Sequence, residues 1–140
     1  MSKNPNVEKL RKAYQAWSDS KAASVDEWAK LMGEGGKLQS LAEQKPHAGI
    51  RSLAASRGMQ ATLDYLGDIK TNWEMQHYDL ERIFADGDQV AAVVDCAWTN
   101  KATGKRFAGR MAHIWSFKAG QVVGFDEFLD TAELIGAATA

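Results

Sequence analysis

The chain has 140 residues, a formal net charge of −1 and 45% hydrophobic residues. These values are typical of one soluble domain with a single core, so we expect residues 1–140 to form a single domain without internal repeats. The near-zero charge and the scattered lysines and arginines argue against nucleic acid or an anionic membrane as a partner. A single cysteine, Cys96, excludes an internal disulfide and fits a reducing compartment. With no secretory signal and no apolar run of bilayer length, we expect a cytoplasmic protein.

The N-terminal half carries helical patterns. Asn4 or Asn6 can cap a first helix, whose apolar stripe is Val7, Leu10, Tyr14 and Trp17. A short second helix follows around Trp28. A third helix is predicted over residues 59–70. The segment 42–57 gives no clear pattern, although its proline and glycines favour a loop.

From Trp73 onward the apolar period changes to two, which indicates strands. We expect strands over residues 73–85, 89–99 and 105–117, with an Asp86-Gly87 hairpin between the first two. Helices followed by a meander of strands predict an α+β fold with the helices on one face of a curved, mixed or antiparallel sheet.

The most informative stretch is the last strand and the residues after it, GQVVGFDEFLDTAEL from Gly120 to Leu134. Its two alternating faces each carry one carboxylate, Asp126 or Glu127, among apolar residues. A carboxylate on a covered face must be hydrogen-bonded or paired, or it keeps its proton. One of these two residues is therefore a candidate for chemistry.

The order of these features resembles the SnoaL-like, ketosteroid isomerase-related branch of the nuclear transport factor 2-like superfamily. The resemblance rests on the Tyr14 helix, the Asp-Gly hairpin, the strand ending in His113-Ile114-Trp115 and the Gly120 to Leu134 ending. It implies a cone-shaped barrel of three N-terminal helices packed on the curved sheet, with a pocket inside. It also implies a homodimer that forms through the outer face of the sheet.

The resemblance also implies which side chains turn inward. The catalytic candidates are Glu127 on the last strand and Tyr14 on the first helix. The remaining pocket-lining residues are mostly apolar, which suits a small-molecule site or a filled core; they are Trp17, Val94, Cys96, Trp98, Ala112, Ile114, Val123, Phe125 and Leu129.

Two sets of catalytic residues known from the superfamily are only partly present in this sequence. In the steroid isomerases, a helix tyrosine matches Tyr14, but the late-strand acid falls on Ala112 and the base falls near Ser40. In the limonene epoxide hydrolases, the last-strand carboxylate matches Glu127, while its two partners fall on apolar or thiol positions. The sequence therefore predicts neither standard enzyme.

Two functions stay open from the sequence. In the first, the cone binds a small, mostly apolar molecule, and Glu127 moves a proton while Tyr14 polarises an oxygen, as an isomerase, hydrolase, cyclase or dehydratase would. Such a reaction needs no cofactor. In the second, the chain is a non-catalytic small-molecule-binding or dimerisation module, and Glu127 forms a rim salt bridge. The identity of the ligand does not follow from the sequence.

A second set of residues alternates along the strands with the residues expected in the pocket. This set is therefore expected on the outer face of the sheet, in the subunit interface. It consists of Asp95, His113, Trp115 and Asp126. A histidine with two carboxylates also invites a metal site, but interface hydrogen bonds are the preferred interpretation. No metal site is predicted, because His47 and His77 have no spaced partner.

Overall fold

The computed structural model describes residues 4–40 and 56–140. Most of the segment 42–57, interpreted above as a loop, lies outside the described residues. The helices are α1 (Pro5–Asp19), α2 (Asp26–Leu31), α3 (Gly58–Asn72) and α4 (Thr131–Ala138). The strands are β1 (Met32–Ser40), β2 (Ser56–Arg57), β3 (Trp73–Asp86), β4 (Gln89–Asn100), β5 (Arg106–Lys118) and β6 (Gln121–Phe128).

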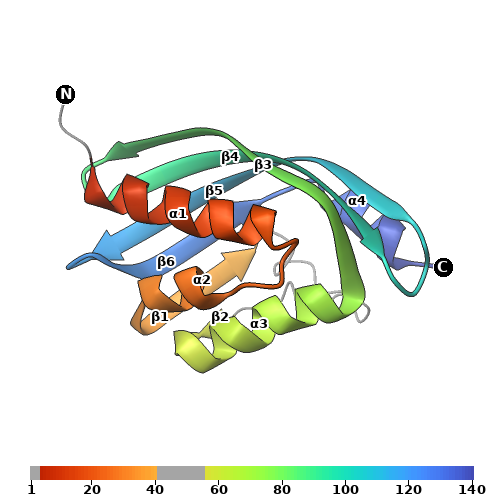
Figure 1. Cartoon of the computed structure of the whole chain (residues 1–140), viewed down its shortest axis with the longest axis horizontal. Coiled ribbons are helices and arrows are strands. Elements are labelled where there is room, and N and C mark those ends of the chain that lie inside the picture. The colour runs from red at the N-terminus through yellow and green to blue at the C-terminus, as the bar shows by residue number, and fades with distance from the viewer. Residues whose placement is uncertain (1–3, 41–55) are drawn as a thin grey trace.

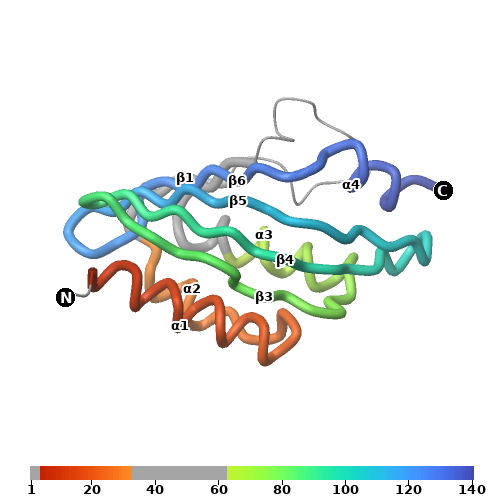
Figure 2. The backbone as a smooth tube through the Cα atoms, turned by 90° about the horizontal axis from the view of Figure 1, so that it is seen from above, coloured from red at the N-terminus to blue at the C-terminus, as the bar shows by residue number. Residues whose placement is uncertain are grey.

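The strands form a six-stranded sheet in the order β2-β1-β6-β5-β4-β3. Only the β1–β6 pair is parallel among the described strands; the others are antiparallel. Helices α1, α2 and α3 lie along one side of the curved sheet, and α4 lies at its far end beside the C-terminus (Figure 1). The view from above shows α1 running alongside β3 (Figure 2). The predicted α+β fold, with three N-terminal helices on a curved mixed sheet, is confirmed.

Local sequence signals mark both ends of helix α1. The Asn4 side chain accepts hydrogen bonds from the backbone N–H groups of Asn6 and Val7, and Pro5 occupies the first turn. After the helix, Lys21 and Ala22 adopt positive φ angles of 53° and 69° and turn the chain back toward the sheet. Leu10, Tyr14 and Trp17 of the predicted stripe are buried and Val7 is half-buried, which brings the aromatic side chains of α1 against the strands.

The pairing of β4 with β5 fixes which side chains face the helices. Met111 lies opposite Val94, and His113 lies opposite Ala92. Directly paired residues of an antiparallel ladder project from the same face, and the β4 partners are buried under the helices. His113 and Trp115 therefore point inward, and their predicted place on the outer face is wrong.

The same pairing corrects two predicted pocket residues. Ala112 and Ile114 alternate with His113 on β5, so they project from the outer face of the sheet and are only half-buried. A shift of one residue reverses the face of every side chain on a strand.

Strand β6 contains a β-bulge, which changes the alternation of its side chains between the two faces of the sheet. Ser116 pairs with Gly124, whereas the next residue, Phe117, pairs with Val122, so Val123 is an extra residue in the ladder. Val123 is 38% exposed, and its predicted place in the pocket is wrong. Beyond this bulge Phe125 and Glu127 face inward as predicted, and they are 7% and 8% exposed.

The core between helices and sheet is rich in aromatic rings. Trp28 stacks on Trp115 with 5.4 Å between ring centroids, and Tyr14 meets the edge of Trp28 at 5.0 Å. Such contacts fix ring positions as well as excluding water. No helix in the described parts of the chain is long and apolar enough to cross a membrane.

Candidate functional site

A cavity of about 110 Å³ remains between the three helices and the inner face of the sheet. Its wall is mostly aromatic or aliphatic, with contributions from α1, α2, α3 and every strand from β3 to β6. Of the predicted pocket residues, Trp17, Trp98, Phe125 and Leu129 border this cavity, as do Tyr14 and Glu127.

Two other predicted pocket residues lie in the core instead. Val94 and Cys96 are fully buried on the inner face of β4, but they do not border the cavity. The Cys96 thiol donates weakly to the carbonyl of Gly109 across the ladder, with 3.7 Å between the two atoms. Burial raises the pKa of this thiol to about 12, so Cys96 is a packing residue.

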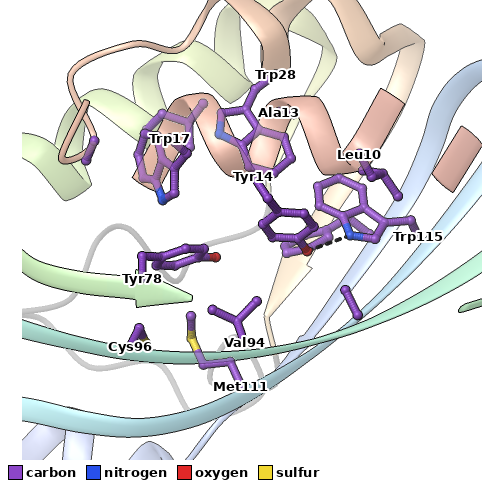
Figure 3. Close-up of a cluster of buried hydrophobic side chains, with 14 of the residues drawn as sticks. Leu10, Ala13, Tyr14, Trp17, Trp28, Tyr78, Val94, Cys96, Met111 and Trp115 are labelled. Carbon is purple, nitrogen blue, oxygen red and sulfur yellow. Dashed lines mark hydrogen bonds between the residues drawn. The ribbon is translucent and has the colours of Figure 1, made fainter. Parts of the chain in front are cut away.

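A row of hydrogen bonds crosses one wall of the cavity. Nε1 of Trp115 lies 2.9 Å from the Tyr14 hydroxyl, which lies 2.5 Å from Nδ1 of His113. Nε2 of the same imidazole lies 3.1 Å from Oε2 of Glu127. The Tyr65 hydroxyl reaches the other carboxylate oxygen at 3.5 Å. We call these five residues the polar row. Figure 3 shows its Trp115–Tyr14 end beneath α1 and α2.

The order of donors along the polar row follows from chemistry. An indole N–H can only donate, so the Tyr14 oxygen accepts from Trp115. With Glu127 as a carboxylate, which only accepts, Nε2 of His113 carries the proton and Nδ1 is left as an acceptor for the Tyr14 O–H. Every donor of the row then has an acceptor inside the row.

Burial changes the pKa values of the two tyrosines in the polar row. Desolvation raises the pKa values of the Tyr14 and Tyr65 hydroxyls well above their usual range, and the charge of Glu127 raises them further. Both hydroxyls therefore stay protonated and act as hydrogen-bond donors at any physiological pH.

The outer face holds the other two predicted interface residues. Asp126 is exposed, and Asp95 is half-buried with an oxygen 3.3 Å from Nε2 of His77. The expectation that His77 has no partner is wrong. Together with Asp79, these are the described residues whose donor atoms could share a metal ion, since all three lie within 4.8 Å of one another. They are solvent-accessible and far from the polar row, because they project from the other face of the sheet.

Sequence reasoning missed three members of the site. His113 and Trp115 were assigned to the opposite face, and Tyr65 on α3 was not singled out. All the aromatic side chains of β5 and Met111 lie at alternate positions, whereas the positions between them hold alanines, Ile114, Ser116 and charged residues. That contrast in size and charge was the available signal for the inner face.

The SnoaL-like domain model matches residues 10–125. Among curated proteins, no sequence matches the chain. An NTF2-like protein of unknown function from Burkholderia pseudomallei has a TM-score of 0.81 at 18% identity, covering 99% of this chain and 100% of that chain.

Two similar structures carry enzyme names. A protein described as a SnoaL-like polyketide cyclase, from Jannaschia sp. CCS1, has a TM-score of 0.77 at 14% identity, covering 100% of this chain and 98% of that chain. A protein described as an isomerase, from Rhodopseudomonas palustris, has a TM-score of 0.72 at 20% identity, covering 99% and 98% of the two chains. At such identities the likeness shows the fold alone. The match over residues 10–125 shows that the chain belongs to the SnoaL-like domain family, and its cone of helices and sheet has the fold of an NTF2-like protein.

Proposed function

We propose that the protein binds a small, mostly apolar molecule in the cavity and transfers a proton within it by acid–base chemistry that needs no cofactor. The observation that carries the proposal is the polar row, which places a histidine–carboxylate pair in an otherwise apolar wall. Buried ionisable groups are costly for a fold, so their presence in a cavity favours a functional role.

Glu127 is the group that we propose takes the proton from the ligand. It borders the cavity, and its two oxygens are held by His113 and Tyr65. The imidazole keeps the carboxylate in one orientation, and Tyr14 keeps the imidazole in one tautomer. The proton that Glu127 receives can then return to a different atom of the same molecule, as in an isomerisation, cyclisation or dehydration. The role first assigned to Tyr14, polarising a ligand oxygen, is replaced here by holding His113.

The size of the cavity suggests the size of the ligand. An engineered cavity of about 150 Å³ admits benzene, so about 110 Å³ holds roughly one small ring, and a second fused ring would lie in the open side of the cavity. The names of the similar structures agree with this chemistry, since one is described as a polyketide cyclase and another as an isomerase.

A suitable probe is 2-indanone, a compact ketone whose two CH₂ groups exchange hydrogen with water under base catalysis. The probe and the protein are mixed in D₂O, and the loss of the CH₂ proton signal is followed by NMR. We expect exchange to be faster than in buffer, and Glu127→Gln to slow it by about 10²-fold or more, the usual size of a general-base contribution.

A matched control is Glu81→Gln, which removes a carboxylate that is bound to Arg110 on the outer face. This variant should exchange the probe at the rate of the unchanged protein. If Glu127→Gln exchanges the probe as fast as the control does, the proposed role of Glu127 is wrong.

The alternative is a binding module without catalysis. It predicts that 2-indanone binds, measured by calorimetry, but that its exchange is no faster than in buffer. If no binding is detected at millimolar probe, the cavity is not a site for ring compounds of this size and both forms of the proposal fail.

We further propose that the protein acts as a cytoplasmic homodimer that pairs through the outer face of the sheet. Support comes from exposed apolar side chains on that face. Phe84 is 61% exposed and Phe128 is 44% exposed, and the half-buried Ala112 and Ile114 lie between them in the ladder. A continuous apolar patch of this kind usually marks an interaction surface. The buried free thiol of Cys96 agrees with a reducing compartment.

A further inference from the structure

The polar row offers no free hydrogen-bond donor to a ligand. Its donors are all directed to acceptors within the row, from Trp115 through Tyr14 and His113 to Glu127. A ligand oxygen that approaches this wall meets acceptors rather than donors. A carbonyl that loses a proton from its neighbouring carbon develops negative charge on its oxygen, and this charge requires a hydrogen-bond donor. The donor must therefore come from another part of the cavity.

Tyr78 on β3 meets this need. The chain has three tyrosines, and all three border the cavity. The hydroxyls of Tyr14 and Tyr65 have partners in the polar row, whereas the hydroxyl of Tyr78 has no hydrogen bond within the described chain. A buried hydroxyl without a partner is unfavourable by about 1–3 kcal/mol, so this oxygen is expected to bind water or a ligand atom.

The Tyr78 ring is held in one position by its neighbours. It lies parallel to Tyr14, with 6.2 Å between centroids and 22° between planes, and its edge meets Trp98 at 6.0 Å. Figure 3 shows the Tyr78 hydroxyl pointing toward Tyr14 beneath α1. Burial also raises the pKa of this hydroxyl well above its usual range, which keeps it a neutral donor. A fixed O–H beside the polar row is suited to orient a ligand.

The indole nitrogen of Trp28 also lacks a partner, but it is enclosed by surrounding atoms. The Tyr78 hydroxyl is not enclosed in this way, so an oxygen atom can reach it. The indole N–H of Trp17, on α1, is likewise without a hydrogen-bond partner in the described chain. A test must therefore separate Tyr78 from Trp17.

We propose that the Tyr78 hydroxyl donates a hydrogen bond to an oxygen of the ligand, so that the natural ligand is a compact ring compound with a carbonyl group whose neighbouring C–H faces Glu127. This inference rests on the proposed function. It adds the chemical class of the ligand and divides the site into a proton-accepting wall on β5 and β6 and an oxygen-binding group on β3.

The test compares two probes of the same shape, 2-indanone and 2-methyleneindane, which replaces the carbonyl oxygen with a CH₂ group. Their affinities are measured by calorimetry in the unchanged protein and in Tyr78→Phe. A neutral hydrogen bond changes affinity by about two- to tenfold. We expect Tyr78→Phe to weaken 2-indanone by about fivefold and to leave 2-methyleneindane unchanged.

A second readout is the carbonyl ¹³C resonance of labelled 2-indanone, which moves downfield when the oxygen accepts a hydrogen bond. We expect a downfield shift on binding to the unchanged protein and to Trp17→Phe, and a smaller shift with Tyr78→Phe. This readout does not depend on fold stability, and its first part needs no variant.

The outcomes separate the two proposals. If 2-indanone binds but the affinity ratio and the ¹³C shift are the same in Tyr78→Phe, Tyr78 does not bind the oxygen, and the proposed function of Glu127 is untouched. If the downfield ¹³C shift is lost in Trp17→Phe instead, Trp17 binds the ligand oxygen and the inference is wrong. If neither probe binds the unchanged protein, the cavity site and the inference fall together.

Discussion

Nε2 of His113 lies 3.1 Å from Oε2 of Glu127, and the two side chains are 2% and 8% exposed. They come from adjacent strands at directly paired positions. A histidine and a carboxylate at this distance, enclosed by aromatic rings, form a charge-assisted hydrogen bond that water screens very little.

The first prediction concerns this pair. Glu127→Gln keeps an oxygen that can accept from Nε2–H of His113, whereas Glu127→Ala leaves that donor buried without a partner. We expect the alanine variant to be less stable than the glutamine variant by about 1–3 kcal/mol. Urea unfolding measures the difference, and ¹⁵N NMR of His113 should show the Nε2–H tautomer in the unchanged protein. An Nδ1–H tautomer would contradict the donor order proposed for the polar row.

The second prediction compares two tyrosines. Tyr14→Phe removes a hydroxyl that binds both Trp115 and His113, so two buried nitrogens lose a partner. Tyr78→Phe removes a hydroxyl with no hydrogen bond in the described chain. We expect Tyr14→Phe to lower the free energy of unfolding by about 1–3 kcal/mol, and we expect no loss from Tyr78→Phe, because the hydroxyl that it removes has no partner in the described chain. Equal losses in the two variants would mean that Tyr78 has a structural partner.

The third prediction concerns alkaline pH. Burial raises the pKa of Cys96 from 9.0 to about 12 in the folded chain. Between these values the unfolded thiol loses its proton while the folded thiol keeps it, so stability is complete below about pH 9 and falls as the pH rises toward 12. Tyr14, Tyr65 and Tyr78 act in the same direction at higher pH, because their pKa values are also raised.

Each such group contributes a slope of up to about 1.4 kcal/mol per pH unit to the free energy of unfolding. Urea unfolding at a series of pH values should show a smaller alkaline slope in Cys96→Ala than in the unchanged protein. The thiol should also resist iodoacetamide at pH 8 until urea unfolds the chain. Rapid labelling of the folded protein would contradict the burial of Cys96.

The fourth prediction concerns the outer face of the sheet. Phe84→Glu places a charge in the exposed apolar patch, where the phenylalanine is 61% exposed. If two copies pair through this face, burying that charge opposes association, and sedimentation should show a dimer for the unchanged protein and a monomer for the variant. Lys101→Glu, at the turn between β4 and β5, is the control and should stay dimeric. If the unchanged protein sediments as a monomer at micromolar concentration, the proposed homodimer is wrong.

Much of the fold followed from local patterns. The Asn4 cap, the stripe of α1 and the Asp86-Gly87 turn, where Gly87 has a φ of 59°, each reflect chemistry between near neighbours in sequence. A period of two identified β3, β4 and β5 as strands within a few residues of their bounds.

The site was predicted less well because it depends on pairing between strands. Glu127 was placed correctly, whereas His113 was placed on the wrong side, since alternation gives two faces without saying which is inner. The choice was decided by the pairing of Ala92 with His113, a contact between residues far apart in sequence. The extra residue Val123 could not be foreseen either, because a bulge follows from how β6 fits β5.

That bulge has an evolutionary consequence. Without Val123 the strand would alternate regularly, and Val122, Phe125 and Glu127 would still share the inner face. Loss of Asp126, by contrast, would turn Glu127 to the outer face and dismantle the site. We therefore expect lineages that keep this chemistry to tolerate the loss of a residue at the bulge and to exclude a deletion between Phe125 and Glu127.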